Sequence, residues 1–378
     1  MTDIERVLPA YKPLVYGPFG LLLSKGAEIY VSDLALLNIR FLARIEVSWK
    51  NKLINCCRLS QRLFRGEFGP AILLKCERKV LLTAFGRFYL LDVDTGKVQE
   101  EGTVGRGKRP LSLASVDVDG FEPGIYFGEY FGNPSKQPVS IFHRDSEAHW
   151  TSVYTFGAGE INHIHAIVPD HVNKCLYILT GDFGDAAAIW IARSNFSEIK
   201  RLVSQEQQSR ACWLMREQNK LFYATDTQLE INHLNVAEID ASDNLTKFKS
   251  LFPVNGSSIY AMQSESFGIV FSTSVEPAPE PKNFILGLLD RKPGKGIVGN
   301  SACLYSGNLE RGFTLILSAE KDIFPARSFQ FGAFMFPSGV PREADVIHAY
   351  GAAVKSYDGC TIMIKNGKIT GKPVSRSL

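Results

Sequence analysis

The sequence carries almost no excess charge and contains no long apolar segment. Its 378 residues include 42 Lys and Arg against 39 Asp and Glu, which gives a formal net charge of +3 at pH 7. Because the basic residues are scattered, this balance gives no reason to expect nucleic acid or an anionic membrane as a partner. No stretch offers the ~18 uncharged apolar residues of a membrane span, and the N-terminus lacks the apolar region of a signal peptide. We therefore expect a cytoplasmic protein with neither kind of partner.

The seven cysteines lack a metal-binding or disulfide pattern. Cys56 and Cys57 are adjacent, and no CxxC pair occurs in the sequence. A zinc site built on cysteine pairs and a disulfide framework are therefore not expected. Buried free thiols in a reducing compartment are the expected alternative.

Long amphipathic helical periodicity is scarce as well, whereas short strand-like runs recur along most of the chain. Residues 71–104 contain four such runs separated by tight turns: AILLKCE, KVLLTAFG, RFYLLDVDTG and KVQEEGTV. Similar groups of four follow, and their second runs end near these residues: Phe85, Glu129, Asp182, Asp226, Glu276 and Pro337. A four-stranded unit that returns every ~40–50 residues is typical of a β-propeller. We therefore predict an all-β propeller of four-stranded blades.

The number of blades depends on the two ends of the chain. At about 50 residues per blade, 378 residues favour seven blades. Segments 14–48 and 328–368 supply roughly three strands each, so they form either two blades or one shared closing blade, which would make six. We expect N- and C-terminal strands to pair within one blade and close the ring. The prediction is a single domain over 1–378 with an inserted Gly-rich loop at about 291–312; a pair of β-sandwiches is the alternative fold.

One hairpin adds a family resemblance. Residues 139–150, VSIFHRDSEAHW, resemble the Asp-box of sialidase-like propellers, with Asp145 and Trp150 at the matching places. Over about 110–340 the sequence resembles an uncharacterised bacterial group of sialidase-like (BNR) proteins, often labelled glycosyl hydrolase and associated with exopolysaccharide gene clusters. The resemblance implies a propeller fold and carbohydrate chemistry. In that family the Asp accepts hydrogen bonds in the turn and the Trp packs between sheets, so the motif implies fold and not catalysis.

Propeller topology predicts where functional side chains gather. Residues just before the first strand and at the end of the second strand of each blade should meet at one mouth of the axial channel. The candidate catalytic residues at these places are Glu129, Asp182, Asp226, Glu276 and His163. The candidate substrate-binding residues are Arg109, Asn133, His165, Arg210, Trp213 and Arg327.

This set of residues suits sugar chemistry in more than one way. Glycoside hydrolysis, the leading prediction, needs two carboxyl groups roughly 5–10 Å apart, one of them with a raised pKa. A uronate lyase is an alternative in which His163 takes the proton and Arg210 or Arg327 neutralises the substrate carboxylate. A non-catalytic platform that binds a glycan or a protein of polysaccharide biosynthesis is the main rival. It predicts that the carboxylates are all paired with arginines and that an exposed apolar patch lies elsewhere.

The partner and cofactor predictions follow from the same residues. Arginines favour carboxylates, so the predicted ligand is an acidic oligo- or polysaccharide. His163 and His165 alternate on a strand and point to the same side of the sheet, where a carboxylate such as Asp182 would complete a metal site. Without a third ligand at a defined spacing, we predict no metal and no cofactor.

Overall fold

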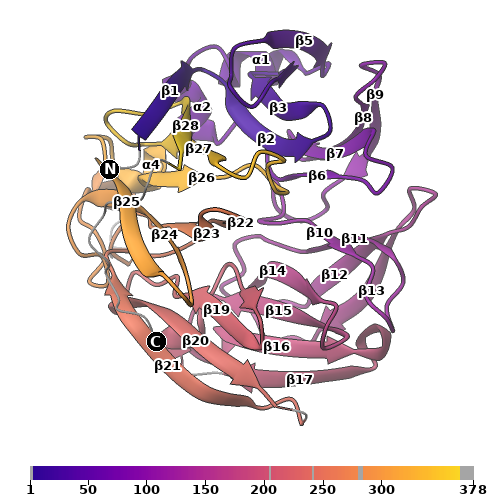
Figure 1. Ribbon diagram of the computed structural model, residues 1–378, viewed down its shortest axis with the longest axis vertical. Helices are drawn as coiled ribbons and strands as arrows, with labels where there is room; N and C mark the ends of the chain where they lie inside the picture. The colour runs from indigo at the N-terminus through magenta and orange to yellow at the C-terminus, as the bar shows by residue number, and fades with distance from the viewer. Residues whose placement is uncertain (1–2, 204–205, 241, 280–283, 367–378) are drawn as a thin grey trace.

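The computed structural model describes residues 3–203, 206–240, 242–279 and 284–366, whose strands form seven four-stranded antiparallel sheets. Figure 1 shows the sheets arranged in a ring around one axis. The predicted all-β propeller is therefore confirmed with seven blades, and the six-bladed and sandwich alternatives are wrong. The first strands of the blades surround an axial channel of about 290 Å³.

The strands follow one another blade by blade. Blade 1 consists of β2 (Lys12–Gly17), β3 (Gly20–Lys25), β4 (Glu28–Ser32) and β5 (Ile39–Arg44), and blade 2 of β6 (Ala71–Leu73), β7 (Lys79–Ala84), β8 (Arg87–Asp92) and β9 (Val98–Thr103). Blade 3 consists of β10 (Ala114–Val116), β11 (Gly124–Gly128), β12 (Val139–Arg144) and β13 (Trp150–Phe156), and blade 4 of β14 (His163–Asp170), β15 (Cys175–Gly181), β16 (Ala188–Arg193) and β17 (Glu198–Val203). Blade 5 consists of β18 (Met215–Glu217), β19 (Lys220–Ala224), β20 (Asn232–Ile239) and β21 (Leu245–Val254), and blade 6 of β22 (Ala261–Ser264), β23 (Gly268–Ser272), β24 (Ser301–Asn308) and β25 (Gly312–Glu320).

Blade 7 combines the two ends of the chain. Its strands are β26 (Ala333–Met335), β27 (Val346–Ala352), β28 (Cys360–Lys365) and β1 (Asp3–Pro9). β1 pairs antiparallel with β28 as the outermost strand, so the predicted closure of the ring is confirmed. The second strand of this blade ends at Ala352, and the predicted end near Pro337 is wrong.

The core lies between neighbouring blades. Ile164 and Ile178 of blade 4 pack with Tyr126 and Ile141 of blade 3 in one apolar cluster. Strands near the axis face a blade on each side, so β15 is buried along its whole length, whereas the outer strand β17 is largely exposed and charged. Apolar runs on inner strands and polar alternation on outer strands produce the repeat visible in the sequence.

Short helices are inserted in the connections. They are α1 (Trp49–Ile54), α2 (Arg58–Phe64), α3 (Phe284–Leu289) and α4 (Ala326–Phe329), with 3₁₀ turns η1 (Gly184–Ala186), η2 (Ser194–Phe196) and η3 (Glu206–Ser209). α1 and α2 connect blades 1 and 2, α3 lies between the second and third strands of blade 6, and α4 precedes blade 7. The insertion in blade 6 therefore starts earlier than predicted. β24 occupies residues within the predicted loop 291–312, and that part of the prediction is wrong.

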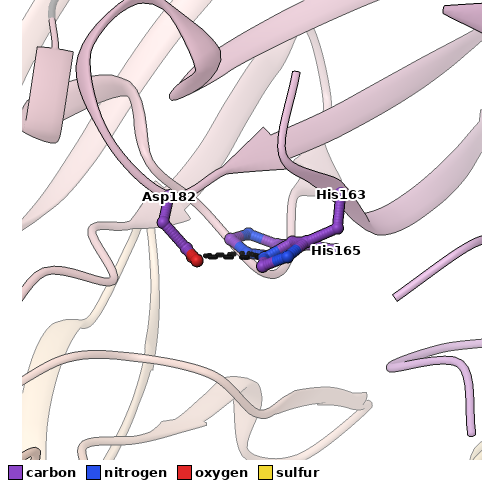
Figure 2. A group of neighbouring side chains, drawn as sticks. All are labelled: His163, His165 and Asp182. Atoms are coloured by element: carbon purple, nitrogen blue, oxygen red, sulfur yellow. Dashed lines mark hydrogen bonds and ion pairs between the residues drawn. The ribbon is translucent and has the colours of Figure 1, made fainter. Parts of the chain in front are cut away.

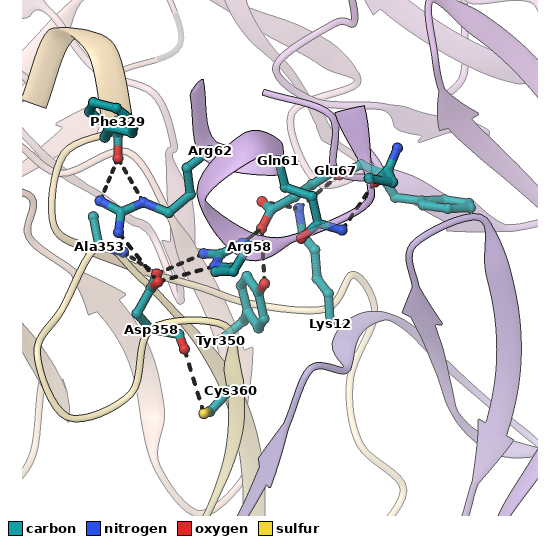
Figure 3. A network of polar contacts seen from close by, with 12 residues as sticks. Lys12, Arg58, Gln61, Arg62, Glu67, Phe329, Tyr350, Ala353, Asp358 and Cys360 are labelled. Carbon is teal, nitrogen blue, oxygen red and sulfur yellow. Dashed lines mark hydrogen bonds and ion pairs between the residues drawn. The ribbon is translucent and has the colours of Figure 1, made fainter. Parts of the chain in front are cut away.

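An ionic network fixes α2 to the last blade (Figure 3). Arg58 pairs with Glu67 and with both carboxylate oxygens of Asp358. Arg62 is almost fully buried and contacts Asp358 and the backbone carbonyl of Phe329. This network joins the connection after blade 1 to the strands that close the ring.

The hairpin between β12 and β13 has the geometry expected of an Asp-box turn. Asp145 accepts hydrogen bonds from the backbone amides of Glu147 and His149 at 2.8 and 2.9 Å. Trp150 stacks on Phe88 of the neighbouring blade with ring centroids 4.4 Å apart. The turn therefore positions an aromatic side chain between blades 2 and 3.

The cysteines agree only in part with the prediction of buried thiols. All seven are free; Cys175, Cys212 and Cys303 are buried, whereas Cys56, Cys57 and Cys76 are exposed. Across the described residues, none of the helices is long and apolar enough to cross a membrane.

Candidate functional site

The mouth of the channel gathers polar side chains from blades 4, 5 and 6, as the topology predicts. His163 starts β14 and Asp182 directly follows β15, and antiparallel pairing places His163 opposite Gly181. Figure 2 shows the Asp182 carboxylate pointing toward the imidazoles of His163 and His165. We call the following residues the mouth cluster: His163, His165, Asp182, Arg210, Cys212, Asp226 and Glu276.

The two imidazoles are held by backbone carbonyls. Nδ1 of His163 lies 3.2 Å from the carbonyl oxygen of Phe131, and Nδ1 of His165 lies 2.8 Å from that of Ala211. Their Nε2 atoms are 3.0 Å apart. Oδ1 of Asp182 lies 3.2 Å from Nε2 of His163 and 3.6 Å from Nε2 of His165. Both rings are thus fixed with Nε2 toward one carboxylate oxygen.

Arg210 connects the carboxylates of blades 4 and 5. Its Nη2 lies 3.1 Å from Oδ1 of Asp182, and its Nε lies 3.3 Å from Oδ2 of Asp226. Burial raises the pKa of Asp182, but His163, His165 and Arg210 outweigh burial and hold this pKa well below its usual value. The thiol of Cys212 donates a hydrogen bond of 3.2 Å to Oδ2 of Asp226, and burial raises the pKa of Cys212.

Glu276 differs from Asp182 in its electrostatic environment. It follows β23, is buried, and accepts a hydrogen bond of 2.8 Å from Ser257. Burial, reinforced by the negative charge of Asp226, raises the pKa of Glu276 to about 7, although Arg210 opposes the rise. The mouth therefore holds one carboxylate that stays ionised and one that takes up a proton near neutral pH.

A pocket of about 710 Å³ opens above this cluster. Asp182 and Glu276 line it together with Phe183, whose side chain is exposed. The remaining lining includes Asn133, Asn162, Gln228, Ala278, Arg327 and Phe331. We call this space the mouth pocket.

Four predicted site residues lie elsewhere or are engaged in structural contacts. Glu129 is buried outside the mouth pocket, pairs with Arg106 and accepts a hydrogen bond of 2.8 Å from the backbone amide of Ser140. Its carboxylate thus connects a loop to blade 3, which is a structural contact. Asp226 lies beneath the pocket against Arg210, and its Oδ1 finds no hydrogen-bond donor among the described residues.

Arg109 and Trp213 line the axial channel and not the mouth pocket. Arg109 donates to the backbone carbonyls of Glu67 and Phe68, and Trp213 donates to Ser258 over 2.9 Å. The predicted substrate contacts for these two residues therefore have no support from their positions.

Several residues at the mouth were not predicted. Cys212 lies two positions after Arg210 at a first-strand entry, and Phe183 directly follows Asp182, so the topological rule could have included both. Gln228 accepts a hydrogen bond of 2.9 Å from Arg210 and lies in a loop without periodicity. No sequence signal would have identified it.

An exposed apolar face lies on α1 and α2. The exposed fractions of five large side chains there are between 43% and 67%: Trp49, Leu53, Leu59, Leu63 and Phe64. Apolar side chains gathered in this way are typical of interaction surfaces.

Comparisons with known proteins show the fold alone. No protein-family model matches the sequence, and no curated protein matches it. A chain in the crystal structure of the mitotic checkpoint complex is similar in structure, with 11% identity, a TM-score of 0.53, and coverage of 96% of this chain and 94% of that chain. The AfRom2 CNH domain is similar with 7% identity, a TM-score of 0.51 and coverage of 97% of both chains. The sialidase-like resemblance therefore receives support for a propeller and none for a sequence family.

Proposed function

We propose that the protein is a binding platform that holds a hydroxyl-rich ligand, a carbohydrate, in the mouth pocket. One observation carries the proposal: the carboxylates of Asp182 and Glu276 and the exposed ring of Phe183 line the same pocket of about 710 Å³. Carboxylates accept hydrogen bonds from sugar hydroxyls, and an aromatic ring offers an apolar surface to the face of a sugar. The volume is in the usual range for small-molecule pockets.

The arginines near the mouth already contact groups of the protein, and this favours a neutral sugar over the predicted acidic one. Arg210 contacts two carboxylates, Arg327 donates to the backbone carbonyl of Ala278, and Arg109 lies in the channel. A carboxylate on the ligand would have to displace Asp182 or Asp226 from Arg210. We therefore expect neutral oligosaccharides to bind more tightly than uronates.

Two further features support a platform. Asp182 and Asp226 are paired with Arg210, and Glu129 is paired with Arg106, whereas Glu276 contacts Ser257, so the pairing that a non-catalytic site predicts is found for three of the four carboxylates. The apolar face on α1 and α2 supplies the exposed patch that the same prediction requires.

Ligand-observed NMR against panels of neutral and acidic oligosaccharides tests the proposal. We expect binding by the wild-type protein and at least tenfold weaker binding by Phe183→Ala, since one stacked ring contributes about 1.4 kcal/mol or more. Phe41→Ala removes a similarly exposed ring on blade 1 and serves as the matched control. Absence of binding across both panels, or equal binding by Phe183→Ala, would contradict the proposal.

Glycoside hydrolysis at the same pocket is the second candidate. It is favoured by two carboxyl groups whose environments shift their pKa values in opposite directions, with Glu276 as proton donor and Asp182 as the ionised partner. Mass spectrometry of the incubated sugars separates the two functions. Products that gain one water and disappear with Glu276→Gln support hydrolysis, and intact sugars support binding alone. The lyase alternative stays a prediction.

A further inference from the structure

We propose that His163, His165 and Asp182 bind a divalent transition-metal ion of the zinc type. The three potential ligand atoms are Nε2 of each histidine and Oδ1 of Asp182, and they lie 3.0, 3.2 and 3.6 Å from one another. All three residues belong to one blade, so the pairing of β14 with β15 holds them in register (Figure 2). The inference does not depend on which ligand enters the mouth pocket.

The orientation of the two imidazole rings supports the inference. Nδ1 of each imidazole faces a backbone carbonyl oxygen, which only accepts hydrogen bonds, so each Nδ1 must carry the ring's proton. A neutral imidazole has a single N–H, and both Nε2 atoms are then bare lone pairs. These lone pairs face each other and Oδ1 of Asp182. Oδ1 also contacts Nη2 of Arg210, whereas the Nε2 atoms of two neutral rings meet no donor among the described residues, and a cation bound by all three atoms would remove this conflict.

The spacing of the three atoms fits such a cation. Zinc binds nitrogen and carboxylate oxygen at about 2.0–2.2 Å, and tetrahedral geometry then places ligand atoms about 3.3–3.6 Å apart. The observed separations of 3.0–3.6 Å need only small adjustments. Two imidazoles with one carboxylate are also a ligand set that first-row transition metals favour over magnesium or calcium.

The surrounding contacts are those of a supported metal site. Metal-binding histidines usually donate their second N–H to a carbonyl or carboxylate, as both rings do here. Arg210 contacts Oδ1 of Asp182 at 3.1 Å, and this oxygen has a further lone pair for the ion. His165, Cys212 and Asp226 form a second group of potential ligands within 4.8 Å, so the ion would have additional donors beneath it.

Charge and access are compatible with an ion. The cluster contains the carboxylates of Asp182, Asp226 and Glu276, and the guanidinium of Arg210 contacts the first two. A divalent cation would compensate the excess of negative charge. Asp182 retains 26% side-chain exposure and lines the mouth pocket, so the ion can enter from that side. Three protein ligands also leave a coordination position for a water or for an oxygen of the ligand.

Zinc binding by the full-length protein tests the inference. The protein is stripped with EDTA, dialysed, and titrated with Zn²⁺ in competition with a chromophoric chelator, and the metal content is measured by mass spectrometry. We expect one zinc ion per chain and no comparable binding of Mg²⁺ or Ca²⁺. His163→Asn and Asp182→Asn should weaken zinc binding by about 100-fold or more, since the loss of a second-shell contact alone costs 10–100-fold.

His143→Asn is the matched control. His143 is a buried histidine of blade 3 that contacts the backbone carbonyl of Pro123 and belongs to neither group of potential metal ligands. The His143→Asn variant should bind zinc as the wild-type protein does. Circular dichroism shows whether each variant is folded. If one ligand variant fails to fold, the other provides the comparison.

The competing explanation is a proton in place of the metal. One imidazole would then be an imidazolium that donates through Nε2, and histidine NMR signals of the stripped protein would show it. That result together with no zinc uptake by the wild-type protein overturns the inference. Equal zinc binding by the wild-type protein and both ligand variants overturns it as well.

Discussion

Two buried ionisable side chains make opposite contributions to the pH dependence of stability. The pKa of Glu276 is raised from 4.5 to about 7, chiefly by burial. In the unfolded chain the carboxyl group ionises at lower pH, so its contribution to stability is full below pH 4.5 and is lost as the pH rises to about 7. A pKa shift of this size corresponds to about 3 kcal/mol of folding stability. The folded protein no longer has this contribution above pH 7, where Glu276 is ionised.

We therefore predict that Glu276→Gln stabilises the protein at pH 8. Its free energy of unfolding, measured in urea with EDTA present, should exceed that of the wild-type protein by on the order of 2–3 kcal/mol at pH 8 and by little at pH 4.5. Glu265→Gln changes an exposed carboxylate and should show no such pH dependence. An equal difference at both pH values would show that the charge of Glu276 has no role.

His348 has the opposite effect on the pH dependence of stability. Burial lowers its pKa from 6.5 to about 4, and Tyr16 and the carbonyl of Leu34 contact its two ring nitrogens at 3.1 and 2.8 Å. The unfolded chain takes up a proton below pH 6.5 and the folded chain does not, so stability falls as the pH decreases from 6.5 to about 4.

His348→Asn should remove this loss. The variant is expected to be less stable at pH 8, because buried hydrogen bonds are lost, but its unfolding midpoint should fall less than that of the wild-type protein between pH 6.5 and 4.5. His149→Asn alters an exposed histidine and should leave the wild-type pH profile in place. A profile of His348→Asn parallel to that of the wild-type protein would contradict the assignment.

At the scale of elements, Asp358 is one of three carboxylates that pair with arginines of helix α2, together with Glu67 and Asp322. Asp358 accepts hydrogen bonds from Arg58 at 2.7 and 3.1 Å and from the backbone amide of Ala353 at 2.7 Å (Figure 3). Arg62 lies 3.3 Å from the same carboxylate and is itself almost fully buried. Removing the negative charge leaves two guanidiniums with fewer acceptors in a region of low exposure.

Asp358→Asn should therefore loosen α2 and leave the inner strands intact. Hydrogen exchange measured by mass spectrometry is expected to increase over residues 49–66, with a loss of about 1–3 kcal/mol in global stability. Asp345→Asn, whose carboxylate lies 3.8 Å from exposed Lys365, is the control and should show neither effect. Unchanged exchange over 49–66 would indicate that the pairs with Glu67 and Asp322 and the apolar contacts hold the helix without Asp358.

The elements could be predicted where burial on both faces produces apolar runs, and not where an insertion interrupts them. Blades 2 to 5 lie where the repeat predicts them. In blade 6, the apolar run FILGLLD has the composition of a strand but contributes α3, and the third strand is the later β24. A short apolar run is compatible with either element, and SACLYSGN contains no Val, Ile or Phe to mark it as a strand.

At the scale of the whole molecule, closure of the ring determines which residues meet. The topological rule predicted that His163, Asp182 and Arg210 converge, because antiparallel strands return to the face where they began. It failed for Glu129, since Arg106 pairs with it from a loop that no periodicity places. The sequence also could not predict which ring nitrogens of His163 and His165 face backbone carbonyls, because those carbonyls belong to Phe131 and Ala211, which are distant in the chain.

The same closure has a measurable consequence at the N-terminus. β1 is the outermost strand of blade 7, and its register with β28 runs from Asp3 opposite Lys365 to Pro9 opposite Cys360. Deleting residues 1–9 exposes the edge of β28 and removes the strand by which the N-terminal end of the chain joins the last blade. We expect a lower unfolding midpoint and faster aggregation than in the wild-type protein. A synthetic peptide of residues 1–11 should restore part of the lost stability by pairing with β28, whereas a scrambled peptide should not. A truncated protein as stable as the full chain would show that contacts between blades 1 and 7, and not the added strand, close the ring.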